Sequence, residues 1–115
     1  MEKPTSIYLL VATYWQRMDE LTEATTRTDA TERETAEHAA AFAAQIEAGE
    51  RVRDAEVAIA AFVPKWRYEA KTKASFLAAL ADENHGTLDA EVTAGLLSSL
   101  ADVVRWQDTA GRASA

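Results

Sequence analysis

Alanine is the commonest residue of this chain and limits what it can fold into, since 25 of the 115 residues are Ala. About 30 larger apolar side chains remain for a core, and Leu, Ile, Val and Phe together number 22. Alanine is the best helix former and lets helices approach closely. Four glycines and two prolines are too few for the turns of an all-β fold. The sequence therefore predicts an all-α protein with a thin core.

A first helix is predicted from a cap at Thr5 or Ser6 to about Thr25. At 100° per residue, one face of this helix is apolar and comprises Ile7, Leu10, Val11, Tyr14, Met18 and Leu21. Tyr8 and Trp15, seven residues apart, form a second stripe beside that face. So broad an apolar surface predicts contact with more than one neighbour.

The next helix is predicted from the pair Thr31 and Glu34, which has the spacing of a capping box, to about Ala48. Gly49 is a candidate stop for it. Its inward residues would be Ala39, Phe42, Ala43 and Ile46, with His38 half-buried at the border of that face. A following segment places Val52, Ala55, Ile59 and Phe62 on one face. The sequence leaves open whether Gly49 ends a helix or only bends it.

Pro64 ends or kinks the preceding segment, because it cannot donate to a helix ladder. Beyond it, an apolar stripe comprises Trp66, Ala70, Leu77 and Leu80, with Phe76 at its edge. The run Asn84-His85-Gly86 closes this helix, and Thr87 with Asp89 can open the last one. The last helix presents a broad face of Leu88, Val92, Leu96, Leu97, Leu100, Val103 and Val104.

These elements predict a compact antiparallel bundle of four to five helices. A chain of 115 residues is too short for two independent cores, so residues 1–107 form a single helical domain and residues 108–115 a frayed polar tail. The wide apolar faces of the first and last helices predict self-association. The candidate oligomer contacts are Tyr8, Trp15, Leu97 and Val104.

Charge is unevenly distributed along the chain, whose formal net charge is −7. Residues 28–50 carry −5, and Glu32, Glu34 and Glu37 are the candidate acidic face for a basic partner protein. Residues 64–81 carry +3. There Lys and Arg alternate with Trp and Tyr, a mixture typical of phosphate and base recognition. Alternatively, these bases face the acidic second helix and merely balance its charge.

The candidate ligand- or partner-binding residues of the basic segment are Trp66, Arg67, Tyr68, Lys71 and Lys73. Lys73 is unusual because its helical angle places it on the apolar stripe. A buried lysine costs several kcal/mol unless it is paired. It would therefore pair with Glu69 in a subunit interface, extend its ammonium group out to water, or meet a ligand anion.

No residue pattern points to catalysis or to a cofactor. The chain has no cysteine and only two histidines, which excludes thiol catalysis and three-histidine metal sites. The Glu-x-x-His pairs of di-iron bundles are missing, as are Gly-x-Ser-x-Gly and phosphate-binding glycine loops. A non-enzymatic protein without metal is expected, and its acidic charge disfavours duplex DNA.

Three functions are consistent with these features. The first is a small acidic binding protein that acts through protein–protein contacts, inhibiting a basic nucleic-acid-handling partner by covering its phosphate-binding surface. The second is an oligomeric small-anion or nucleotide binder that uses residues 65–73. The third is a structural or assembly subunit. The longest apolar run, residues 7–12, is too short to span a membrane, so a cytoplasmic protein is expected. The predicted self-association would make it a homo-oligomer.

Overall fold

The computed structural model describes residues 6–84 and 86–100, and no strand occurs among them. Three helices are α1 (Ile7–Asp29), α2 (Ala36–Ala61) and α3 (Arg67–Glu83). A fourth helix covers residues 90–100. The predicted all-α class is confirmed, and the described residues form four helices, whereas a compact antiparallel bundle and self-association stay predictions. His85, Val104 and the predicted tail at residues 108–115 lie outside the described residues.

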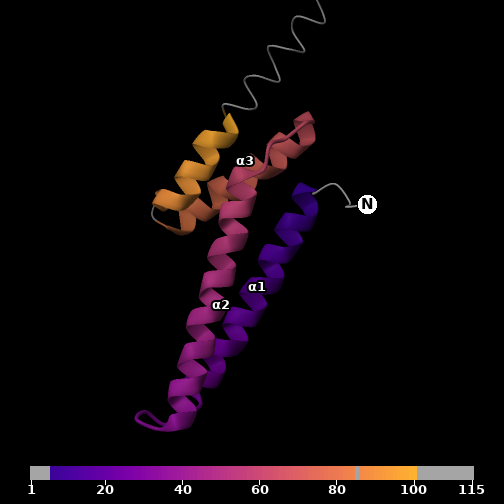
Figure 1. Cartoon of the computed structure of the whole chain (residues 1–115). Coiled ribbons are helices and arrows are strands. Elements are labelled where there is room, and N and C mark those ends of the chain that lie inside the picture. The colour runs from indigo at the N-terminus through magenta and orange to yellow at the C-terminus, as the bar shows by residue number, and fades with distance from the viewer. Residues whose placement is uncertain (1–5, 85, 101–115) are drawn as a thin grey trace, which may run out of the picture.

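Helices α1 and α2 form a long hairpin, in which they lie side by side and run in opposite directions (Figure 1). Helix α3 and the helix over residues 90–100 pack near one end of this hairpin only, which we call the wide end (Figure 1). The other end holds the connection between α1 and α2, and we call it the tip. No described helix is both long and apolar enough to cross a membrane.

Helix α1 agrees closely with its prediction. Ser6 is the N-cap, and its Oγ accepts a hydrogen bond from the backbone N–H of Tyr8 at 3.2 Å. Ile7 and Tyr14 are buried against α2, and the remaining residues of the predicted face pack around them: Leu10, Val11, Met18 and Leu21. The helix ends four residues later than predicted, at Asp29.

The predicted capping box at Thr31 and Glu34 is wrong. Thr35 is the N-cap of α2, and its Oγ1 accepts a hydrogen bond from the backbone N–H of His38 at 3.1 Å. Glu34 adopts a positive φ of 66°, so it belongs to the turn and cannot be the third residue of a helix. Thr31 instead donates from Oγ1 to the carbonyl oxygen of Thr28 at 2.8 Å, which helps to close the end of α1.

Helix α2 passes through Gly49, so Gly49 does not end a helix and does not divide this part of the chain into two helices. Pro64, in contrast, lies in the connection between α2 and α3. A glycine inside a helix is tolerated at a modest entropic cost, about 1 kcal/mol relative to alanine. The helix continues through Gly49 because burial of the nearby Ala48 and packing of Val52 against Ile7 and Tyr14 of α1 outweigh that cost.

The predicted inward face of the first half of α2 is also wrong. Ala39, Phe42, Ala43 and Ile46 are exposed. The buried face of the second half, Val52, Ala55 and Ile59, continues backwards at helical spacing through Ala48, Gln45 and Ala41. Because the helix is continuous, the same side of α2 faces α1 along its whole length. The apolar residues that seemed to define the interior are a second stripe on another side of α2.

The wide end contains two small hydrophobic clusters that meet at Phe76. One joins Ile7 and Tyr14 of α1 to Val52, Ala55 and Ile59 of α2. The other joins Ala60 of α2 to α3 and to the last helix: Leu77, Leu80 and Val92. The ring of Phe76 packs edge-on against Tyr14, with 4.8 Å between ring centroids, and contacts both clusters. As predicted, Asp89 begins the last helix by accepting a hydrogen bond from the backbone N–H of Val92 at 3.0 Å.

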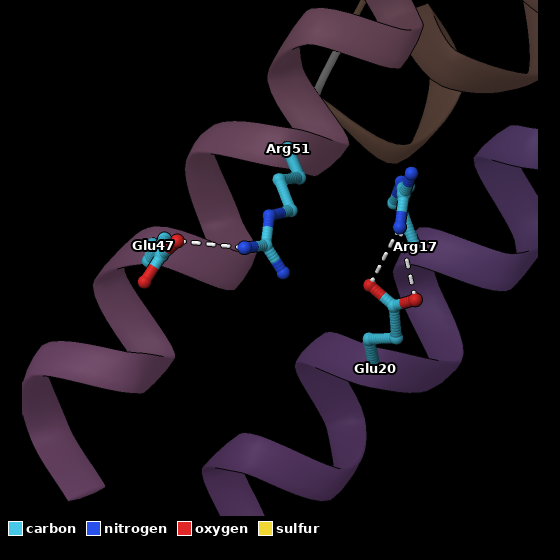
Figure 2. A network of polar contacts seen from close by, with 4 residues as sticks. All are labelled: Arg17, Glu20, Glu47 and Arg51. Carbon is cyan, nitrogen blue, oxygen red and sulfur yellow. Dashed lines mark hydrogen bonds and ion pairs between the residues drawn. The ribbon is translucent and has the colours of Figure 1, made fainter.

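Exposed charges along the hairpin pair mainly within their own helix. Figure 2 shows Arg17 with Glu20 on α1, at 3.0 Å, and Arg51 with Glu47 on α2, at 2.6 Å. Such pairs stabilise a helix by only about 0.2–0.5 kcal/mol each. They do not tie α1 to α2, so contact between these helices depends on apolar packing.

The interior position of Gly49 makes a prediction about stability. The space around Gly49 is open, since no neighbouring atom lies within 4 Å of the place that an alanine methyl group would take, and its φ is not in the left-handed region. We expect Gly49→Ala to raise the free energy of unfolding by about 0.5–1 kcal/mol, because alanine restricts the unfolded chain. Thermal unfolding followed by circular dichroism measures the change.

The matched control is Gly86→Ala. Gly86 has a φ of +85°, which an L-residue adopts only with strain, so this variant should be less stable than the wild type. A destabilising Gly49→Ala would contradict a continuous α2.

Candidate functional site

Lys73 is buried at the wide end, with 5% of its surface exposed. Its Nζ donates hydrogen bonds to the backbone carbonyl oxygen of Phe62 at 2.7 Å and to Oγ of Ser99 at 2.6 Å. Ser99 Oγ in turn donates to the carbonyl oxygen of Leu96 at 2.8 Å. Phe62 is the C-cap of α2 and Ser99 lies in the last helix. One side chain of α3 therefore connects two other helices.

The contacts within one chain bear on two of the three alternatives for Lys73, whereas a pair across a subunit interface stays a prediction. Its amine does not reach out to water, because the side chain is buried. It does not pair with Glu69 within the chain either: Oε1 of Glu69 accepts hydrogen bonds from the backbone N–H groups of Lys65 at 2.9 Å and of Trp66 at 3.2 Å. Glu69 thus caps the start of α3, where a negative charge is favourable.

Burial lowers the pKa of Lys73 from its usual value of 10.5 to about 8. Lys73 lines a half-open pocket of about 150 Å³, whose walls are apolar apart from Lys73 and Ser99. Its lining residues are Pro64, Ala70, Lys73, Ala74, Leu77, Leu96, Ser99 and Leu100. Both hydrogen-bond acceptors of the amine, the Phe62 carbonyl oxygen and Ser99 Oγ, belong to the protein itself. These hydrogen bonds therefore hold the helices of the wide end together.

The rest of the basic segment lies on the surface beside α1. Trp66, Arg67, Tyr68 and Lys71 are all exposed, as is Lys65. The ring of Tyr68 stacks on that of Tyr8 from α1, with 6.2 Å between centroids and 10° between planes. We call this surface the basic–aromatic end, defined by Tyr8, Lys65, Trp66, Arg67, Tyr68 and Lys71. The predicted binding segment is thus one exposed surface without Lys73.

The candidate acidic face lies at the tip of the hairpin. Glu32 and Glu34 belong to the connection between α1 and α2, and Glu37 to the first turn of α2. All three are exposed, and none forms an ion pair within residues 6–84 and 86–100. Beside them, Nδ1 of His38 lies 2.9 Å from Oγ1 of Thr31 and its ring stacks on Phe42, which is the half-buried structural position expected for this histidine.

The acidic tip and the basic–aromatic end lie at opposite ends of the hairpin (Figure 1). Helix α2 has 26 residues, which at 1.5 Å per residue separates its ends by about 39 Å. Screening at physiological ionic strength acts over about 8 Å. The bases therefore do not balance the acids of the tip within one chain, and the alternative in which the two clusters face each other is wrong.

Sequence reasoning missed a group of charges between α2 and the last helix. Arg53 pairs with Asp89 at 3.7 Å and with Glu91 at 3.4 Å. Burial, followed by the nearby Asp89, raises the pKa of Glu56, an effect that Arg53 opposes. Burial, followed by Glu56, also raises the pKa of Tyr14. Within the described part of the chain, no cluster of acidic or histidine side chains could hold a metal ion.

Three of the candidate oligomer contacts fall within the described residues. Tyr8, Trp15 and Leu97 are each more than half exposed, and Tyr8 belongs to the basic–aromatic end. The ring of Trp15 contacts only the edge of Tyr14 among described aromatic side chains. The structure therefore leaves these apolar side chains accessible.

Comparison with protein-family models, with curated proteins and with solved structures found no match to this chain.

The buried position of Lys73 predicts a characteristic pH dependence. The folded protein releases the Lys73 proton near pH 8, whereas the unfolded chain holds it to about pH 10.5. The unfolded state therefore binds more protons between these values, and the free energy of unfolding from this group rises with pH, by at most about 1.4 kcal/mol per unit. Lys73→Met removes this contribution, so the stability of the wild type relative to Lys73→Met should increase from pH 8 to 10.

Urea unfolding at each pH measures the difference in free energy of unfolding between the wild type and Lys73→Met. The titrations of other groups largely cancel in this difference. Lys71→Met, at an exposed position on the same helix, is the matched control and should follow the wild type. Parallel curves for the wild type and Lys73→Met would contradict the buried amine.

Proposed function

We propose that this protein is a small, non-enzymatic binding protein that acts through protein–protein contacts and docks its acidic tip on a basic partner. The observation that carries the proposal is the position of Glu32, Glu34 and Glu37. These exposed carboxylates lie at the far end of a long hairpin and have no cationic partner among the described residues.

The shape of the hairpin supports this use. Around the tip, α1 and α2 contact each other without a third described helix beside them, so the acidic end projects from the wide end (Figure 1). A projecting acidic end can enter a basic groove that a compact body could not reach. The tip is negative overall, although Arg33 lies between Glu32 and Glu34, and a net negative charge steers association with a basic partner and raises its rate. A suitable partner is a protein whose basic surface otherwise binds phosphates, which would make this chain an inhibitor of nucleic-acid handling.

A second candidate function is supported by the basic–aromatic end. Trp66 and Tyr68 are exposed beside Arg67 and Lys71, and aromatic rings among bases are a combination that stacks on nucleobases and attracts phosphates. Nucleotide titration monitored by Trp fluorescence tests this alternative, and an unchanged signal counts against it.

The acidic-tip proposal predicts the effect of charge reversal. A variant carrying Glu32→Lys, Glu34→Lys and Glu37→Lys should bind a basic partner at least tenfold more weakly, because attraction becomes repulsion. Partners captured by the wild-type chain at low salt are purified, and each is titrated against both proteins by isothermal calorimetry. Binding by the wild type should also weaken strongly near 0.5 M salt.

The matched control is Asp82→Lys with Glu83→Lys, which changes exposed acids at the end of α3, away from the tip. This control should bind like the wild type. Equal affinity of the tip variant and the wild type, or binding that persists in high salt, would refute the proposal.

A further inference from the structure

No other described helix covers the exposed apolar stripe on the first half of α2, where Phe42 meets only the ring of His38 from the same helix among described aromatic side chains. We call this surface the arm stripe, and it comprises Ala39, Phe42, Ala43 and Ile46. Phe42 and Ile46 each expose 50% of their surface. At the wide end, the corresponding side of α2 is covered, because Val57 and Ala60 pack against Val92 and its neighbours in the last helix. The arm stripe therefore has the composition of a buried helix face, but none of the described helices covers it.

We propose that a second copy of this chain covers the arm stripe with its basic–aromatic end. The two surfaces match in apolar character, since Trp66 and Tyr68 are each more than half exposed. Large aromatic side chains are the residues that contribute most to protein interfaces. Burying them against Phe42 and Ile46 removes four large apolar groups from water in one contact.

The charges around the two surfaces are complementary. Glu47 follows Ala43 by one helical turn, and Glu50 follows Ile46 by one turn, so both exposed carboxylates border the arm stripe. The pairing of Glu47 with Arg51 is exposed and intrahelical, and is worth little (Figure 2). The opposing surface presents Lys65, Arg67 and Lys71. Residues 28–50 carry −5 and residues 64–81 carry +3, so the match extends beyond single pairs.

Only another molecule can bring these surfaces together. They lie toward opposite ends of the hairpin, and a continuous 26-residue α2 keeps them apart within one chain. Every copy carries one surface of each kind. Two antiparallel copies can therefore form both contacts at once around a two-fold axis, whereas a staggered arrangement would extend as a chain.

A charge-exchange experiment tests the proposal. The arm variant carries Glu47→Lys and Glu50→Lys, and the end variant carries Arg67→Glu and Lys71→Glu. In the arm variant both surfaces are basic, and in the end variant both are acidic, so each alone should be monomeric. In an equimolar mixture, the basic arm meets the acidic end and the acidic arm meets the basic end. Association should then return.

Analytical ultracentrifugation over a concentration series measures the mass of each protein and of the mixture. The control with Asp82→Lys and Glu83→Lys should associate like the wild type. A third variant, Phe42→Ser with Ile46→Ser, should be monomeric and melt near the wild-type monomer, because both side chains are already half exposed in a single chain.

The expected result is an associating wild type, monomeric variants and an associating mixture. A wild type that is monomeric throughout, variants that associate alone, or a mixture that remains monomeric would overturn the proposal. These variants leave Glu32, Glu34 and Glu37 intact. Failure of self-association is therefore separable from failure of the acidic tip to bind a basic partner.

Discussion

Three helices of the wide end meet at one buried lysine amine, whose hydrogen bonds join them although burial disfavours its charge. The chain leaves α2 at Phe62 because Pro64 follows, and the free carbonyl oxygens at a helix end need donors. Lys73 supplies a charged donor to the Phe62 carbonyl oxygen, where the helix dipole also favours a cation. The same amine holds Ser99 of the last helix. Three helices are thus fixed at one point, which a thin, alanine-rich core alone would hold less firmly.

The positions of the large apolar residues along the hairpin determine where a third and a fourth helix can pack. Tyr14, Ile59, Phe76, Leu77, Leu80 and Val92 all gather at the wide end. Toward the tip, the residues of α1 and α2 that are buried or half-buried include small or polar ones such as Ala24, Thr28 and Ala41. These residues allow two helices to approach closely but bury little area. The unequal thickness of the molecule follows from this distribution.

Sequence periodicity predicted the elements whose apolar residues form a single stripe. The buried face of α1, the caps at Ser6 and Asp89 and the face of Val52, Ala55 and Ile59 all follow from local spacing. The first half of α2 carries two candidate stripes, because alanine is compatible with either environment. There periodicity favoured the stripe with the largest side chains, Phe42 and Ile46. The face that is buried is instead the one that continues the buried residues of the second half of α2.

The sequence predicted which residue types form the candidate site better than it predicted which residues would contact one another. Alternating bases and aromatics in residues 65–71 do form one surface, since the start of α3 presents them outward beside Tyr8. The partners of Lys73 were not predictable, because Phe62 and Ser99 lie 11 and 26 residues away and meet only after three helices pack.

Separation of the two charged surfaces has a consequence for binding. If acids and bases were neighbours, they would neutralise each other within the chain and neither would attract a partner over distance. A rigid α2 of about 39 Å keeps them several screening lengths apart, so each keeps its own field. The hairpin thus keeps an acidic surface and a basic surface apart on one chain. The proposed docking of the tip and the proposed self-association both depend on this separation, which the net charge of −7 alone does not reveal.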